Sequence, residues 1–123
     1  MTEIRLSFIL NHMVQYTPRL DKTFAALSDP TRRGILVRLG RGDASITDLA
    51  GRFGMTLTGM KKHVSLLEEA GLVTTKKVGR VRNARLGPRR LEDESDWIEM
   101  YQRMLNERLN RLEAFLERTK GAP

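Results

Sequence analysis

The chain has 123 residues, a formal net charge of +7 and no cysteine, and 40% of its residues are hydrophobic. This length fits one domain, or one domain with an appended helix, and leaves no room for a large enclosed pocket. Without cysteine, disulfides, thiolate nucleophiles and cysteine-ligated metals are excluded. The positive charge favours a polyanionic partner, either nucleic acid or an acidic membrane surface.

The N-terminal residues 1–17 are interpreted as an arm. Apolar residues alternate there as in a strand, but Ile9 interrupts the pattern. A partly ordered arm and an element exchanged between subunits both remain open, and Met13 is an alternative candidate for the translation start. The apolar stretch is too short for a signal peptide, and no run approaches the roughly 20 residues that cross a bilayer. We therefore expect a cytoplasmic protein.

Two short helices are predicted next. The segment "PRLDKTFAALSD" has an apolar stripe at helical spacing, formed by Leu20, Phe24 and Leu27. In "SDPTRRGILVRLGRG", Asp29 is a good N-cap, Pro30 suits the first helical position, and Gly40 with Gly42 ends the helix. For Arg32 and Arg33, contact with a phosphate backbone is weighed against local pairing or solvation, which is commoner for such arginines.

A tight pair of helices follows. The segment "SITDLAGRFG" predicts a helix capped by Thr47 and ended by Gly54, and residues 55–57 form a turn into a helix over 57–70. At about 100° per residue this helix has one apolar side, formed by Leu57, Met60, Val64, Leu67 and Gly71. Its other side carries polar groups, namely Thr58, Lys61, Lys62, Ser65 and Glu69, with His63 at the flank.

The charge distribution on the helix over 57–70 indicates its use. Both of its acids, Glu68 and Glu69, lie at the C-terminal end, so the N-terminal half is cationic. Lysines near the positive end of the helix dipole are locally unfavourable, which is tolerable where that end meets phosphates. Taken singly, Lys61 and Lys62 could be a solvated face and Thr58 only an N-cap. Behind a short helix and a tight turn, they instead predict a recognition helix for the DNA major groove.

A basic hairpin comes directly after this helix. The runs "LVTTKKV" and "RVRNARL" around Gly79 and Arg80 predict two strands within residues 72–86. Residues 52–90 hold ten Lys or Arg against two acids, whereas residues 92–123 hold five bases against eight acids. The candidate DNA contacts of the hairpin are Lys76, Lys77, Arg80, Arg82 and Arg85. Half of the side chains on a two-stranded ribbon point away from any one partner, so some of these are expected to be spectators.

A long helix is predicted over 93–119, after a break at Pro88, with residues 120–123 as a tail. We interpret its apolar stripe as core or subunit interface rather than as a ligand wall. The stripe consists of Trp97, Tyr101, Met104, Leu105, Leu112, Phe115 and Leu116. A two-fold dimer makes physical sense, because one recognition helix reads only a few base pairs and a second is needed about one DNA turn away.

The segments "FAALSDPTRRGILVRL" and "SITDLAGRFGMTLTGMKKHVSLLEEAGLV", with the basic hairpin, resemble the ArsR-type winged helix-turn-helix repressors over residues 18–118. The resemblance implies a mainly α fold with a small β-hairpin, in the order helix, helix, short strand, helix, helix, two strands, helix. It implies a homodimer formed by the first and last helices, with residues 18–92 binding DNA and residues 93–119 dimerising. It also implies that Thr56, Thr58, Lys61, Lys62 and His63 face DNA.

No metal site or cofactor is expected. Metal-sensing members of that family carry a Cys-x-Cys pair where this chain has Ser45 and Thr47, and a hydroxyl is a poor ligand for soft metals. Other members use histidines on the final helix, which has none here. The two histidines are His12 in the arm and His63 on the predicted DNA face.

The expected function is sequence-specific binding of double-stranded DNA as a repressor at a palindromic operator, with any small-molecule inducer unidentified. The alternative is a winged-helix module that binds a protein through its basic face. Single-stranded nucleic acid would favour exposed aromatic side chains for stacking, and the basic region has only Phe53, which is assigned to the core. An enzyme is not expected, because no set of titratable groups converges as acid–base catalysis requires.

Overall fold

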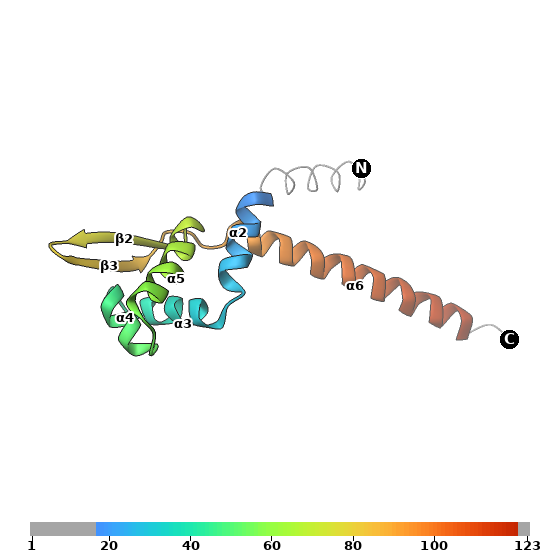
Figure 1. The fold of residues 1–123 in the computed structure, drawn as a ribbon. Coiled ribbons are helices and arrows are strands. Elements are labelled where there is room, and N and C mark those ends of the chain that lie inside the picture. The colour runs from blue at the N-terminus through green and yellow to red at the C-terminus, as the bar shows by residue number, and fades with distance from the viewer. Residues whose placement is uncertain (1–16, 121–123) are drawn as a thin grey trace. The chain divides into compact units, whose positions relative to one another are not determined.

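The computed structural model describes residues 17–120 (Figure 1). Across them the elements are α2 (Thr17–Leu27), α3 (Pro30–Leu39), β1 (Ala44–Ser45), α4 (Ile46–Arg52), α5 (Leu57–Glu69), β2 (Val73–Val78), β3 (Val81–Leu86) and α6 (Glu92–Lys120). The predicted fold class is confirmed. The chain forms two compact units, and the boundary between them falls between Arg90 and Leu91. The predicted arm before Thr17, with Met13, and the end of the predicted tail lie outside the described residues.

The junction of α2 and α3 is built as the sequence predicts. The Asp29 side chain accepts a hydrogen bond from the Arg32 backbone N–H at 3.0 Å, and Pro30 occupies the first helical turn. The apolar stripe of α2 is only partly right, since Leu20 is buried but Phe24 is 37% exposed. Small residues, not larger apolar ones, complete the buried side of α2, namely Thr23 and Ala26.

The N-cap of α4 is Ser45, so the predicted cap at Thr47 is wrong. Ser45 belongs to the short strand β1, which pairs antiparallel with β3 through Ala44–Ala84 and Ser45–Asn83. This pairing holds Ser45 in an extended conformation, and its hydroxyl accepts from the Asp48 N–H at 3.0 Å. Ser45 followed by Asp48 three residues later is a local capping signature, and the prediction chose the neighbouring Thr47 instead.

The core of the first unit lies where α3, α4, α5 and the base of the sheet meet. Its largest fully buried apolar side chains are Ile35, Leu49, Met60, Leu67, Val64 and Val73. Gly34 interrupts α3 at a cost of about 1 kcal/mol relative to alanine. A Cβ at Gly34 would lie 2.9 Å from the Phe53 ring, so a side chain at this position would force that ring to shift.

The hairpin β2–β3 forms the wing and projects beyond the helices of its unit (Figure 1). The strands pair antiparallel from Val73–Leu86 at the base to Val78–Val81 at the tip. Gly79 has φ of +63° and is the first of the two turn residues, the position where a type II′ turn favours glycine. The predicted hairpin around Gly79 and Arg80 is therefore confirmed in position, and the structure supplies its register.

The last element, α6, has acids in its first turn and basic residues in its last turn, which suits the helix dipole. It extends the predicted helix by one residue at each end. Despite its length α6 is strongly charged, and among residues 17–120 no helix is apolar enough over a sufficient length to cross a bilayer.

Candidate nucleic-acid interface

Helix α5 is oriented by its buried side. Thr56 caps it, with its hydroxyl accepting from the Gly59 N–H at 3.1 Å, so Thr58 is free of the capping role. The buried residues are Met60, Val64 and Leu67, as predicted. Leu57 was expected among them but is 43% exposed, because it is the first residue of the helix and lies beyond the core.

The opposite side of α5 presents exposed hydrogen-bonding groups, namely Thr58, Lys61, Lys62 and Ser65. Within the described part of the chain, neither Lys61 nor Lys62 has a hydrogen-bond or ion-pair partner. The first turn of α5 contains no acid that could neutralise them. Two adjacent ammonium groups near the positive end of a helix dipole repel one another and are stabilised by an external anion.

The side chain of His63 differs from the rest of the predicted DNA-facing set. It is half-buried at the flank of α5, and its Nδ1 lies 3.2 Å from Nη1 of Arg32 and 4.0 Å from Oδ2 of Asp29. The Arg32 guanidinium also donates to the Ala25 and Ala26 carbonyls at the end of α2. Arg32 is thus engaged locally rather than available to a phosphate.

Arg33 behaves in the same way as its neighbour. Its Nη1 donates to the Leu27 carbonyl at 2.7 Å. The two arginines therefore satisfy carbonyl groups of the last turn of α2, which have no partner within that helix. Of the two interpretations of this arginine pair, local pairing is the one that the structure supports.

The register of the wing separates its cations onto two faces. Lys77 lies directly opposite Arg82, on the face that also carries the buried residues Val73 and Ala84. Lys76 and Arg85 point to the other face, because side chains alternate along a strand. A directly opposed pair of like charges destabilises a hairpin, so Lys77 and Arg82 together favour an anionic partner.

Two of the five predicted wing cations already have partners within the chain. Arg82 donates to the Thr75 hydroxyl at 3.0 Å, and Arg85 lies 3.5 Å from the Asp43 carboxylate. Lys76, Lys77 and Arg80 are exposed and have no such partner among residues 17–120. These three are the wing residues most available to a ligand.

The wing is attached to α5 by a contact that the sequence pattern did not reveal. Oε2 of Glu68 accepts from the Thr75 N–H at 3.0 Å and from the Thr75 hydroxyl at 2.6 Å. Glu68 is thus a structural acceptor for β2 as well as a negative charge at the end of the helix. Hydrogen bonds to a carboxylate are stronger than neutral ones, so this contact holds the ribbon and the helix in one arrangement.

Arg89 was counted in the basic excess of residues 52–90, but it belongs to the interior of its unit. Its Nη1 donates to the Thr23 hydroxyl at 2.9 Å and to the Ala70 carbonyl at 2.6 Å. Arg89 therefore ties α2 to the end of α5 and is not part of the basic surface.

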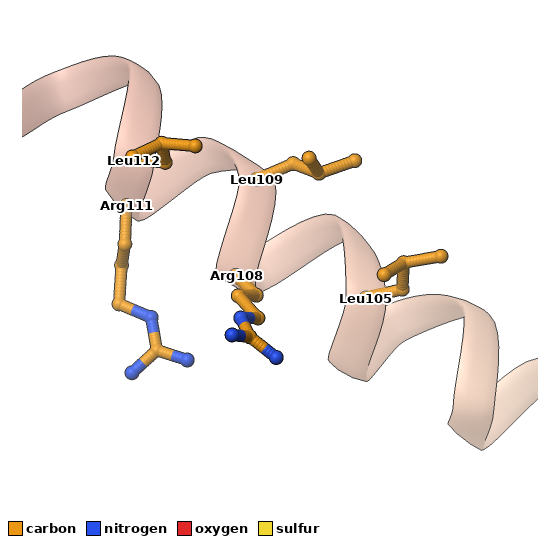
Figure 2. A pocket seen from close by; sticks show the side chains of 5 residues that line it. All are labelled: Leu105, Arg108, Leu109, Arg111 and Leu112. Atoms are coloured by element: carbon orange, nitrogen blue, oxygen red, sulfur yellow. The ribbon is translucent and has the colours of Figure 1, made fainter. Parts of the chain in front are cut away.

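The candidate dimer residues fall into a buried and an exposed group. Leu20 is 6% exposed in the single chain, which leaves little of it for a partner. Each predicted residue of α6 is at least 38% exposed, and Ile98 and Leu109 extend the predicted stripe. Figure 2 shows Leu105, Leu109 and Leu112 along one side of α6, with the guanidinium groups of Arg108 and Arg111 directed away from them.

A metal site finds no support in the described ranges, where no group of three or more His, Asp or Glu side chains is close enough to hold an ion. Ser45, at the position compared with a metal-binding cysteine, is the N-cap of α4. Its hydroxyl is already occupied by a backbone N–H.

Comparison with known proteins decides the family. Residues 27–76 match a helix-turn-helix domain. The chain is 30% identical over 79 residues to the transcriptional repressor SdpR of Bacillus subtilis, covering 64% of this chain and 88% of that protein. A crystal structure of an ArsR family transcriptional regulator is 37% identical with a TM-score of 0.68, covering 74% of this chain and 94% of that one.

An ArsR-like regulator from Rhodococcus sp. RHA1 is 33% identical with a TM-score of 0.64, covering 89% of this chain and 98% of that one. The chain belongs to the ArsR family of winged helix-turn-helix transcriptional regulators. As a member of this family it is a DNA-binding regulator and not an enzyme, as the sequence predicts. The β2–β3 ribbon is the wing of the fold, and α4 and α5 form the helix-turn-helix.

Proposed function

We propose that this regulator is a homodimeric repressor that binds a palindromic operator, with α5 in the major groove and the wing on the adjoining backbone. The observation that carries the proposal is the pair of exposed lysines, Lys61 and Lys62, which have no partner among residues 17–120 and lie on the side of α5 opposite its buried residues. A recognition helix needs this division, because one side must pack while the other enters the groove. Repression is supported by the 30% identity to SdpR, which is a repressor.

The residues proposed to contact DNA have distinct roles. Lys61 and Lys62 on α5, with Lys76, Lys77 and Arg80 on the wing, neutralise phosphates and so supply salt-dependent affinity. Thr58 and Ser65 are exposed hydroxyls on the same side of α5 and are suited to hydrogen bonds with base edges or phosphates. The Thr56 hydroxyl accepts the capping hydrogen bond, which leaves its proton and one lone pair available to a ligand.

Dimerisation is proposed through α6, because the positions of its apolar residues form a mirror-symmetric pattern. Reflection about the peptide bond between Asn106 and Glu107 exchanges the members of five pairs. These pairs are Trp97 with Leu116, Ile98 with Phe115, Tyr101 with Leu112, Met104 with Leu109, and Leu105 with Arg108. Two copies of such a helix, related by a two-fold axis and running antiparallel, place the apolar residues of four pairs opposite one another and Leu105 opposite Arg108.

Arg108 discriminates between the two directions of pairing. In a parallel, in-register pair each Arg108 would lie beside its own copy at the edge of the seam, which is unfavourable for like charges. In the antiparallel pair Arg108 lies opposite Leu105 of the other copy. Its aliphatic stem then packs on the leucine while the guanidinium stays in water. We therefore propose an antiparallel pair of α6 helices.

The proposed DNA-binding face is tested with a duplex that the unaltered protein selects from a randomised library. The double variant Lys61→Ala/Lys62→Ala is expected to lose binding to this duplex in a gel shift, and the slope of log affinity against log salt should fall by about two. Lys22→Ala/Lys120→Ala removes the same charge from exposed positions outside α5 and the wing, and should bind nearly as the parent does.

Circular dichroism and sedimentation must show both double variants folded and dimeric. If Lys61→Ala/Lys62→Ala binds the duplex as well as the parent, α5 is not the reading element. If the parent selects no duplex from the library, a protein partner for the basic face becomes the better proposal.

A further inference from the structure

His63 lies on the recognition helix, yet one edge of its ring is turned to the protein. Nη1 of Arg32 approaches Nδ1 of His63 to 3.2 Å, across 31 residues of sequence. A guanidinium can only donate hydrogen bonds, so Nδ1 must be the acceptor and cannot carry a proton in this contact. The proton of the neutral ring is then on Nε2, and the imidazole is held as a single tautomer.

The competing contact of the same nitrogen is weaker. Nδ1 of His63 is 4.0 Å from the Asp29 carboxylate, which is beyond hydrogen-bond distance. Asp29 instead accepts the Arg32 backbone N–H at 3.0 Å as the N-cap of α3. The carboxylate is therefore committed to the start of α3, and the guanidinium of Arg32 is what reaches α5.

Arg32 is itself fixed by the two elements that it joins. Nε donates to the Ala26 carbonyl at 2.8 Å and Nη2 to the Ala25 carbonyl at 3.0 Å. Because these donors and the backbone N–H all have partners, the guanidinium has little freedom to move. The end of α2, the start of α3 and the flank of α5 are thus joined through one side chain.

This connection adds a second constraint to the buried side of α5, which sets only approximately which way the helix faces. Successive residues of an α-helix are about 100° apart, so fixing the azimuth of His63 also fixes those of its neighbours. Lys62 directly precedes His63, and the buried Val64 directly follows it. A small rotation of α5 would keep Val64 in the apolar core, but it would change the direction in which Lys61 and Lys62 leave the surface.

We propose that His63 is a positioning residue, held by Arg32 in the Nε2–H tautomer, that sets the orientation of the recognition helix and does not read the operator. The inference rests on the proposed function, since orientation matters for activity only if α5 enters DNA. It also assigns a role to Arg32, which transmits the position of α2 to α5 without touching DNA.

Two substitutions of His63 separate positioning from reading. In His63→Asn the side-chain oxygen lies about where Nδ1 is, so the acceptor for Arg32 is kept and the Nε2–H donor is lost. In His63→Gln the amide extends to about the position of Nε2, so a donor is kept there and the acceptor near Arg32 is lost. A positioning role predicts that His63→Asn binds the selected duplex within about threefold of the parent. His63→Gln should bind about tenfold more weakly or worse, as expected for a lost hydrogen bond to a charged group.

The opposite ranking, with His63→Gln near the parent and His63→Asn impaired, would overturn the proposal in favour of direct reading. Equal affinities for all three proteins, or equal loss in both variants, would also overturn it. A second measurement needs no substitution. A long-range proton–nitrogen NMR spectrum of the free protein near neutral pH should show an unprotonated Nδ1 and a protonated Nε2 for His63, and a protonated Nδ1 refutes the proposal.

This outcome is distinguishable from failure of the proposed function. If Lys61→Ala/Lys62→Ala leaves binding intact, α5 is not the reading element, whatever the His63 variants do. If that double variant loses binding while the His63 variants do not follow the predicted ranking, only the positioning role fails.

Discussion

The two compact units of the chain treat their apolar residues in opposite ways. In the unit that ends at Arg90, each of α3, α4 and α5 buries large apolar side chains, several of them at 0% exposure. In α6, nine large apolar side chains are between 38% and 56% exposed. The first unit therefore has a core of its own, whereas α6 is an amphipathic helix with an exposed apolar stripe that a partner would cover.

The exposure of the α6 stripe predicts that charged substitutions there will have the largest effect on dimerisation and DNA affinity. Leu105→Glu/Leu112→Glu should yield a folded monomer, because both leucines are about half exposed in the single chain and their loss leaves the core of the first unit intact. Affinity for the selected duplex should fall by about 100-fold or more, as two linked half-site contacts become one. Sedimentation and gel shifts measure the two effects.

Disulfide crosslinking can test the direction of the helix pair. Because the chain has no cysteine, an introduced cysteine is unique. In an antiparallel pair Ile98→Cys should form no disulfide with its own copy, but it should do so with Phe115→Cys when the two variants are mixed. Efficient self-linking of Ile98→Cys would indicate a parallel pair. A dimer that persists in Leu105→Glu/Leu112→Glu would show that α6 is not the interface.

Truncating one buried leucine of the first unit and one exposed leucine of α6 compares what each contributes to the free energy of unfolding. Leu67→Ala in the core should lower the free energy of unfolding by about 2–5 kcal/mol, because it removes a fully buried side chain and leaves a cavity. Leu109→Ala should leave the unfolding free energy of the monomeric Leu105→Glu/Leu112→Glu background nearly unchanged, since Leu109 is 54% exposed. Denaturant titration followed by circular dichroism gives both values. Equal losses would mean that α6 packs as core.

The smallest predicted effect is at Asp29, in the first unit. The backbone N–H of Arg32 holds the pKa of the Asp29 carboxyl below its usual 3.8, with a smaller contribution from the charge of the Arg32 guanidinium. A carboxyl with a lowered pKa in the folded state adds stability above its unfolded-state pKa, and that stability is lost as the pH falls through the folded-state value.

Asp29→Asn keeps a good N-cap and removes the charge. The stability difference between parent and Asp29→Asn should be constant above about pH 5 and shrink on acidification below about pH 4. Urea titrations at several pH values measure it. A difference that grows on acidification would have the wrong sign for this interaction.

Local signals predicted most of this fold, and non-local contacts account for what was missed. The cap at Asp29, the buried side of α5 and the turn at Gly79 depend on residues close in sequence, so patterning identifies them. The pairing of Ser45 with Asn83 is non-local, and no local pattern reports it.

The candidate site shows the same division. Sequence placed Lys61 and Lys62 on the outer side of α5, but it could not show that Arg32 reaches His63, or that Glu68 binds Thr75. Composition likewise counts every cation equally. The structure shows that Arg82, Arg85 and Arg89 already have hydrogen-bond or ion-pair partners within the chain.

The two hydrogen bonds between Glu68 and Thr75 fix the spacing between α5 and the base of the wing. Since the carboxylate accepts hydrogen bonds from both the amide and the hydroxyl of Thr75, it holds the base of the wing at a defined separation from α5, the proposed reading helix. A duplex must then match that length with its own groove width and local twist. Base steps that deform at low cost between the two points of contact would be favoured even though no side chain touches them.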